Sequence, residues 1–226
     1  MAERILYVGP LSLFSRKAEI ALREKGLDYR RVLVPFTQEA GYRPKHPVVL
    51  QHNPKGQVPV LVEDGFALFD STLILEYLED AHPAPPLYPR PARARAQCRR
   101  IELEADEILF APVRSLLYRT EPALADPAAQ ALRERAGSDA EAEIARQFAG
   151  LDARLGGGDW FCGAAFSAAD IAMFMTVLWT QRLKGPRLSA HPALAAWYAR
   201  MLNRPSCAKA AEEIAAADRE LSPALG

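Results

Sequence analysis

One proline inside a predicted strand constrains this chain more than any other feature. Residues 53–62 are Asn-Pro-Lys-Gly-Gln-Val-Pro-Val-Leu-Val, and the apolar run from Val58 to Val62 is typical of a buried strand. A proline there gives up a ladder hydrogen bond, so we expect Pro59 at a sheet edge or a bend. If the Val58–Pro59 bond is cis, Val58 turns its N–H and C=O outward, where they can pair with an extended peptide. The stretch therefore predicts an edge that binds a peptide through its backbone.

A predicted helix start supplies a second binding element. After the turn at residues 63–65 and a short strand at 66–69, Asp70-Ser71 opens a helical pattern that continues to about residue 80. The free N–H groups and positive dipole end of such a helix hold a carboxylate, and Ser71 adds a hydroxyl donor. Asp70 can accept from an ammonium group, so the pair fits an α-amino acid. The alternative is an ordinary helix cap, and the two roles are compatible.

As a set, these residues closely resemble the glutathione transferase family. The matching pieces are residues 53–59, Asp70-Ser71, and residues 12–17, which are Ser-Leu-Phe-Ser-Arg-Lys. A box-like helix cap at Ser167 and Asp170 and an all-helical second half are also similar to the family. The resemblance covers nearly the whole chain and is weakest from about residue 120 to residue 139. It implies a serine-type, bacterial-like cytosolic member with a thioredoxin-like α/β N-terminal domain and an all-α C-terminal domain.

The order of predicted elements in the first third matches a thioredoxin-like layout. We expect a strand over residues 4–8, a helix over 18–25 and a strand over 30–34, then a loop through 42–52 before the hairpin. This domain is placed at residues 1–82. Five of the 18 prolines fall within residues 82–91, which indicates a stiff linker at 83–91.

Residues 92–226 are predicted to form the helical domain. A long helix is expected from Ala92 to about Arg119, with Ile108 on its apolar face and a kink at Pro112. Further helix signals are the Asp126-Pro127 start, a break or kink at Gly137 with a capping box at Ser138 and Glu141, and a stop at residues 156–158. A nearly all-apolar helix is expected from Ile171 to Trp179, and further helices are expected to start at Pro192 and Pro205.

Composition limits the classes of partner. Lysine plus arginine and aspartate plus glutamate both number 28, so no net field favours nucleic acid or an anionic membrane. We expect no signal peptide and no membrane-spanning segment. Three cysteines without metal-ligand spacing argue against a disulfide framework and favour a reducing cytoplasm, and four histidines without a ligand constellation predict no metal site.

The resemblance places thiol activation at Ser12. Residues 12–15 have the spacing of a Cys-x-x-Cys motif but carry two serines, so the thiol must come from glutathione as co-substrate. By resemblance, Ser12 donates its hydroxyl proton to the glutathione sulfur, and the thiolate attacks an electrophilic carbon or a peroxide oxygen. A plain cap or loop hydroxyl is the alternative for Ser12. Ser15 and Tyr7 are rival donors, and Tyr7 falls inside the first strand.

The resemblance also assigns the remaining site residues. Gln57 and Lys45 are expected at the glycine end of glutathione, with Lys45 as a point charge for its carboxylate. The glutathione-binding set is Val58, Pro59, Asp70, Ser71, Gln57 and Lys45. Candidates for the pocket of a small hydrophobic electrophile are Leu11, Phe110, Arg114 and Tyr118, with core packing as the alternative for Phe110.

Two other functions stay open. The chain can be a binding or regulatory module that keeps the transferase scaffold without its chemistry, as the stringent starvation proteins do. It can also be a dedicated glutathione-dependent isomerase, dehalogenase or etherase. The resemblance further implies a homodimer and a role in detoxification.

Overall fold

The computed structural model describes residues 3–222. In chain order, its helices and strands are β1 (Arg4–Val8), α1 (Leu13–Glu24), β2 (Arg30–Leu33), α2 (Pro47–His52), β3 (Val60–Glu63), β4 (Phe66–Phe69), α3 (Ser71–Ala81), α4 (Ala92–Leu103), the π-helical segment η1 (Glu104–Leu109), α5 (Phe110–Arg114), the 3₁₀ turn η2 (Leu117–Arg119), α6 (Pro127–Leu155), α7 (Ala168–Arg182), the 3₁₀ turn η3 (Leu188–Ala190), α8 (Pro192–Leu202) and α9 (Pro205–Leu221).

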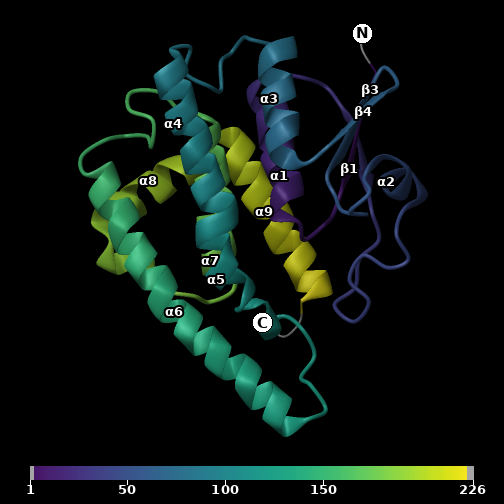
Figure 1. The fold of residues 1–226 in the computed structure, drawn as a ribbon, viewed down its shortest axis with the longest axis vertical. Helices are drawn as coiled ribbons and strands as arrows, with labels where there is room; N and C mark the ends of the chain where they lie inside the picture. Colours follow the sequence, from purple (N-terminus) through teal and green to yellow (C-terminus); the bar gives the residue numbers. More distant parts are fainter. Residues whose placement is uncertain (1–2, 223–226) are drawn as a thin grey trace.

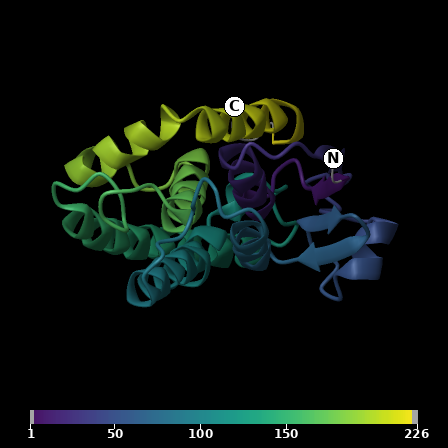
Figure 2. The ribbon, with the colours of Figure 1, turned by 90° about the horizontal axis from the view of Figure 1, so that it is seen from above.

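The N-terminal domain is built on a four-stranded mixed sheet with the order β2-β1-β3-β4. Strand β1 runs parallel to β2 and antiparallel to β3, and β3 runs antiparallel to β4. Helices α1 and α3 lie on one side of the sheet and α2 lies on the other (Figure 1). The helices from α4 onward form the second domain beside α1 and α3 (Figure 2). This is the predicted thioredoxin-like domain followed by an all-α domain.

Helix α1 packs against both domains. It contacts α3 within its own domain and α7 and α9 of the helical domain. Buried apolar side chains from the sheet, α1, α3, α4 and α7 form one continuous core, whereas a smaller cluster with Tyr7, Val49 and Val60 fills the space under α2. The sheet side of α1 therefore belongs to the same core as the centre of the helical domain.

Several predicted elements of the first domain are confirmed and others are wrong. Strands β1 and β4 have the predicted bounds, but β3 begins at Val60 because Pro59 has no N–H for the ladder. The Val58–Pro59 bond is cis. The predicted loop at 42–52 contains α2, and α1 begins at Leu13, five residues before the predicted start, since Ser12 caps it.

The long helix predicted from Ala92 to about Arg119 is interrupted where its hydrogen-bond pattern widens into a π-helical segment. The segment η1 lies between α4 and α5, and Pro112 follows it in the first turn of α5. The extra residue in a π turn rotates the helix face. Ile108, predicted on the apolar face, is therefore 56% exposed, whereas Leu109 is buried.

Helix α6 is continuous through Gly137, so the predicted break there is wrong. Asp126 caps its start by accepting from the Ala128 N–H at 2.9 Å, and Gly156 ends it with φ +55°, both as predicted. Gly137 is needed for packing instead: a Cβ atom there would stand 2.5 Å from Cε1 of Tyr118. The residues predicted as a capping box, Ser138 and Glu141, lie inside the helix.

The centre of the helical domain is α7, as predicted. Nearly all of its side chains are buried, and its start is held by Asp170. The Asp170 carboxylate accepts from the Ser167 N–H, the Ser167 hydroxyl, the Phe161 N–H and the Trp197 indole N–H at 2.9–3.0 Å. Helices α8 and α9 begin at the predicted prolines, Pro192 and Pro205. Within residues 3–222, no helix has the length and hydrophobicity needed to cross a bilayer.

Two glycines of α6 should respond oppositely to a methyl group. Gly150 has nothing within 4 Å of an added Cβ, so Gly150→Ala should raise the free energy of unfolding by about 0.5–1 kcal/mol through helix propensity. Gly137→Ala should lower it by about 1–2 kcal/mol, because the Tyr118 ring is held between Arg119 and Arg133, each guanidinium 5.6 Å from the ring centroid. Urea unfolding measures both, and a stabilised Gly137→Ala variant would contradict the packing role.

Candidate functional site

A large cleft runs between the two domains. Its volume is about 1070 Å³. The N-terminal domain contributes residues from α1, from the loops around α2 and from the start of α3: Phe14, Tyr42, Asn53, Lys55, Gln57, Val58, Pro59, Phe69, Asp70, Ser71 and Thr72. The helical domain contributes residues from α4 to η2: Ala96, Arg99, Arg100, Leu103, Asp106, Glu107, Phe110, Arg114 and Leu117.

The loop before Val58 is shaped by Asn53. The Asn53 amide nitrogen donates to the Gln57 carbonyl at 2.7 Å, and its side-chain oxygen accepts from the Lys55 N–H at 2.9 Å. Gly56 has φ +59°, a conformation that glycine adopts without strain. The side chain of Asn53 thereby fixes the loop that leads into Val58 and Pro59, both of which line the cleft. The sequence motif included Asn53, but the sequence analysis gave it no role.

The start of α3 faces the same cleft. Asp70 has φ +74°, and its carboxylate oxygen accepts from the Thr72 N–H at 3.0 Å. Ser71 is buried in the first turn, and Asp70, Ser71 and Thr72 all line the cleft. The cleft thus contains a helix N-terminus, which attracts a carboxylate, beside a carboxylate that can accept from an ammonium group.

The structure distinguishes the three candidate hydroxyl donors. Ser12 caps α1: its Oγ accepts from the Ser15 N–H at 3.2 Å, which leaves its proton available to another acceptor. The Ser15 Oγ accepts from the Gly9 N–H at 3.2 Å, and the residue is completely buried. Tyr7 lies in β1 within the cluster under α2, with its ring 5.1 Å from that of His46. Of the three, Ser12 and Tyr7 keep a small exposed fraction, 9% each.

Not every predicted site residue lies on the cleft wall. Gln57, Val58, Pro59, Asp70, Ser71, Phe110 and Arg114 do, whereas Leu11, Ser12, Lys45 and Tyr118 are absent from the wall formed by the described residues. Lys45 packs beside Gly56: its Cδ and Cε would be 3.7 Å from a Cβ there. Lys55 lines the cleft instead, and sequence reasoning missed it although it belongs to the quoted motif.

Tyr42 was also missed, because nothing in its own sequence neighbourhood points to the cleft. Its ring lies over Gly9, where an added Cβ would stand 2.0 Å from the Tyr42 hydroxyl oxygen. The hydroxyl is buried without a hydrogen-bond partner among residues 3–222, and burial raises the pKa of Tyr42. A glycine at position 9 is thus required by the close approach of a ring from a distant loop.

A buried ionic cluster joins the two domains at the base of the cleft. Lys17 of α1 is completely buried and pairs with Asp106 of η1 and, at 3.2 Å, with Glu102 of α4. The Thr72 and Tyr88 hydroxyls donate to Glu102 at 3.0 and 2.8 Å. Burial alone lowers the pKa of Lys17, but Asp106 and Glu102 outweigh it and raise that pKa. Burial raises the pKa of Glu102, and Lys17 opposes that shift.

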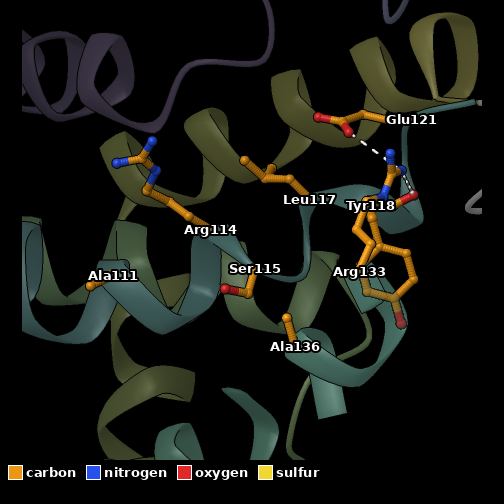
Figure 3. Close-up of a pocket in the computed structure, with 8 residues that line it drawn as sticks. All are labelled: Ala111, Arg114, Ser115, Leu117, Tyr118, Glu121, Arg133 and Ala136. Atoms are coloured by element: carbon orange, nitrogen blue, oxygen red, sulfur yellow. Dashed lines mark hydrogen bonds and ion pairs between the residues drawn. The ribbon is translucent and has the colours of Figure 1, made fainter. Parts of the chain in front are cut away.

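The far end of the cleft is apolar and opens into a side cavity. The rings of Phe14 and Phe110 meet edge to face, with centroids 5.4 Å apart, so each domain supplies one ring. The side cavity has a volume of about 480 Å³ and shares Arg114 and Leu117 with the cleft. Tyr118 lines this cavity rather than the cleft (Figure 3).

The part of the chain that the structure describes contains no group of three or more histidine, cysteine or carboxylate side chains arranged to hold a metal ion. The wall of the cleft offers hydroxyl groups, a helix N-terminus and charged side chains. These groups suit the binding and deprotonation of a small ligand that carries its own reactive atom.

Comparison with known proteins gives matches along most of the chain. The family model "Glutathione S-transferase, N-terminal domain" matches residues 11–81, and "Glutathione S-transferase, C-terminal domain" matches residues 108–205. A glutathione S-transferase of Xanthomonas campestris pv. campestris is 33% identical over 159 residues, covering 70% of this chain and 76% of that protein. An uncharacterized GST-like protein of Escherichia coli is 38% identical over 126 residues, 55% of this chain and 59% of its own length.

A solved structure agrees with these matches. The crystal structure of a glutathione S-transferase from Rhodospirillum rubrum superposes with a TM-score of 0.78 and 30% sequence identity, covering 92% of this chain and 91% of that one. The cleft residues of the N-terminal domain lie inside the first family match, and Phe110, Arg114 and Leu117 lie inside the second.

Removing the Lys17 side chain should weaken the contact between the two domains. Lys17→Met leaves the carboxylates of Glu102 and Asp106 without their cation, so we expect the free energy of unfolding to fall by about 3–5 kcal/mol. Urea unfolding measures the loss. In the double variant Lys17→Met/Asp106→Asn, part of the stability should return because one uncompensated charge is gone.

The matched control is Lys209→Met, since Lys209 is exposed on α9 and should change stability by less than about 0.5 kcal/mol. Equal losses in Lys17→Met and Lys209→Met would contradict a structural role for the buried cluster.

Proposed function

The chain belongs to the glutathione S-transferase superfamily, and from this premise we propose that it is a glutathione transferase that activates the glutathione thiol through Ser12. The observation that carries the proposal is the arrangement of one cleft: Val58 before a cis Pro59 and the N-terminus of α3 line the same wall. Backbone groups for a peptide and a helix end for an amino acid are what a γ-glutamyl tripeptide requires.

The proposed binding mode assigns each part of glutathione to one element. The cysteinyl backbone pairs with the N–H and C=O of Val58, and the γ-glutamyl carboxylate lies at the first turn of α3 near Ser71. The Asp70 carboxylate accepts from the γ-glutamyl ammonium group while it continues to cap Thr72, because each carboxylate oxygen accepts more than one hydrogen bond. The glycine carboxylate lies toward Gln57 and Lys55.

Thiol activation in this proposal needs no general base. Ser12 lies at the N-terminal end of α1 and its proton is not used by the Ser15 contact. A hydroxyl donor together with a helix dipole stabilises an anion, and lowering a thiol pKa from about 8.5 by roughly two units needs about 2.7 kcal/mol. The thiolate then forms a bond to an electrophilic carbon or a peroxide oxygen in the apolar half of the cleft, beside Phe14 and Phe110.

A second candidate function is a binding module on the same scaffold. It is favoured by the position of Ser12, which is only 9% exposed and does not lie on the cleft wall. A dedicated isomerase, dehalogenase or etherase uses the same thiolate and differs only in the second substrate. A homodimer in the cytoplasm remains part of the proposal by analogy with the superfamily.

Ser12→Ala tests thiol activation directly. Bound glutathione is titrated with pH while the ultraviolet absorbance of its thiolate is followed. In the wild type we expect ionisation roughly two pH units below that of a free thiol, and in Ser12→Ala a return toward the free value with tight binding retained. The rate of conjugation with a neutral aryl chloride should fall by about 10²-fold.

Ser15→Ala and Tyr7→Phe serve as comparisons in this titration. Equal ionisation in wild type and Ser12→Ala moves the donor role to whichever of these two variants raises the ionisation pH. If the wild type does not bind glutathione, the transferase proposal fails and the binding-module function takes its place.

A shortened ligand can distinguish the roles of Lys55 and Lys45 in binding the glycine carboxylate. Lys55 is exposed on the cleft wall, whereas Lys45 packs beside Gly56. We expect Lys55→Met to weaken glutathione binding about fivefold, the effect of one exposed charge pair, and Lys45→Met to weaken it less. Neither change should alter the affinity for the C-terminal amide of γ-glutamylcysteine, which has no carboxylate at that end. Calorimetric titration measures all six affinities, and a larger effect of Lys45→Met would return the glycine end to Lys45.

A further inference from the structure

Most cations around the cleft already have a carboxylate partner. Arg99 pairs with Glu76 at 2.6 Å, and Arg100 pairs with Glu104. Lys17 is held by Glu102 and Asp106. On the proposed glutathione side of the cleft, Lys55 makes no ion pair within the described residues 3–222, and the proposed function already uses its charge for the glycine carboxylate.

Arg133, which lines the side cavity, and Arg119 next to it are also paired with carboxylates. Arg119 pairs with Glu141 at 3.0 Å, and Arg133 pairs with Glu121 at 3.4 Å. The guanidinium groups of Arg119 and Arg133 also stack on the Tyr118 ring. These two arginines are therefore occupied by the protein itself.

Arg114 is the exception on the electrophile side. It is exposed, it lines both the cleft and the side cavity, and its side chain makes no ion pair or hydrogen bond with any residue in the described range 3–222. Its guanidinium points away from Tyr118 and Arg133 (Figure 3). A fork of N–H donors without a partner, at the junction of two cavities, matches a planar anion such as a carboxylate.

The groups next to Arg114 define the rest of such a ligand. One helical turn before it lies Phe110, whose ring meets Phe14 edge to face. Leu117 follows three residues later on the same wall. Aromatic rings and aliphatic carbon favour a flat apolar body, so the site combines an aryl-binding surface with one unpaired cation at its end.

One acidic residue on this wall, Glu107, favours a cationic group on the ligand instead of an anionic one. Glu107 is exposed, lines the cleft and, like Arg114, makes no ion pair within residues 3–222. It lies seven residues before Arg114, which is about 10 Å along a helix axis, with Phe110 between them. A ligand stacked on Phe110 therefore has a cation at one end and an anion at the other, and its own charge decides which end is used.

We propose that Arg114 makes this cleft selective for electrophiles that carry a carboxylate, with the aromatic body against Phe14 and Phe110 and the carboxylate on the guanidinium. The proposal deepens the transferase function above and depends on it for turnover, but the binding step does not. Side-cavity space beyond Arg114 leaves room for substituents next to the carboxylate.

Binding of two compounds that cannot react tests the Arg114 site without turnover. Calorimetric titration compares 3,5-dinitrobenzoate with the uncharged 3,5-dinitrobenzamide, both without a leaving group, on glutathione-saturated protein. The wild type should bind the acid at least fivefold more tightly than the amide. In Arg114→Gln this preference should fall below about twofold.

Arg100→Gln is the matched control, because Arg100 lines the same cleft but is paired with Glu104. The preference for the acid should stay within about twofold of the wild-type value in this variant. Equal loss in Arg100→Gln and Arg114→Gln would mean that a general positive potential, not Arg114, selects the acid, and the proposal would be wrong. A wild type that prefers the amide, or binds neither compound, would also overturn it.

Measurements of turnover then show whether the carboxylate site and the transferase activity hold independently of each other. With 4-chloro-3,5-dinitrobenzoate and the corresponding amide, the thiolate forms a carbon–sulfur bond at the ring carbon and chloride leaves with the bonding pair. The ratio of kcat/KM for acid over amide should fall about tenfold in Arg114→Gln and stay near the wild-type value in Arg100→Gln. If the acid binds through Arg114 but neither of the two aryl chlorides is converted, the binding inference holds and the transferase function fails.

Discussion

The ion pairs of Lys17 are the interaction on which the geometry of this protein depends. A completely buried ammonium group is costly unless carboxylates and hydrogen bonds surround it, and here Glu102, Asp106 and Thr72 do so. Lys17 belongs to the first domain and both carboxylates belong to the second. The pairs can form only when the two domains meet in one relative position, and that position sets the width of the cleft.

Helix α1 connects the buried Lys17 to Ser12, the proposed thiol-activating residue. Ser12 caps its first turn, and Arg16 and Arg23 on the same helix pair with Glu213 of α9 at 3.0 Å. The helix is therefore held by α4, η1 and α9 at the same time, which leaves its N-terminal end little freedom. A hydroxyl that is to stabilise a thiolate benefits from such a fixed position, because a preorganised donor costs no reorganisation when charge develops.

The two ends of the cleft differ in their charges. The end proposed to bind glutathione combines a helix N-terminus, the Asp70 carboxylate and Lys55, which suits a ligand with both an ammonium group and carboxylates. The proposed electrophile end is apolar around Phe14 and Phe110 and carries Arg114, which has no ion-pair partner among residues 3–222. The π-helical segment η1 connects the buried cluster to the cleft wall, since it supplies Asp106 to Lys17 and Glu107 to the wall.

The sequence by itself determined the features whose causes are local. The strands β1 and β4, the start of α3 at Asp70-Ser71, the cap at Asp126, the box at Ser167 and Asp170, and the helix starts at Pro192 and Pro205 all follow from residues within one turn of each other. Two local motifs, at residues 53–59 and at Asp70-Ser71, also predicted that Gln57, Val58, Asp70 and Ser71 would share one site, and all four line the cleft.

Only the tertiary structure decided the features that depend on distant partners. Gly137 lies within a continuous helix because Tyr118 packs against it, Gly9 is required by Tyr42, and the extra residue of η1 turned Ile108 outward. Which arginine of the cleft wall has no carboxylate partner among residues 3–222 depends on Glu76 of α3 and Glu104 of η1. Such contacts join residues that no periodicity or cap signal relates, since their positions are fixed only when the whole core packs.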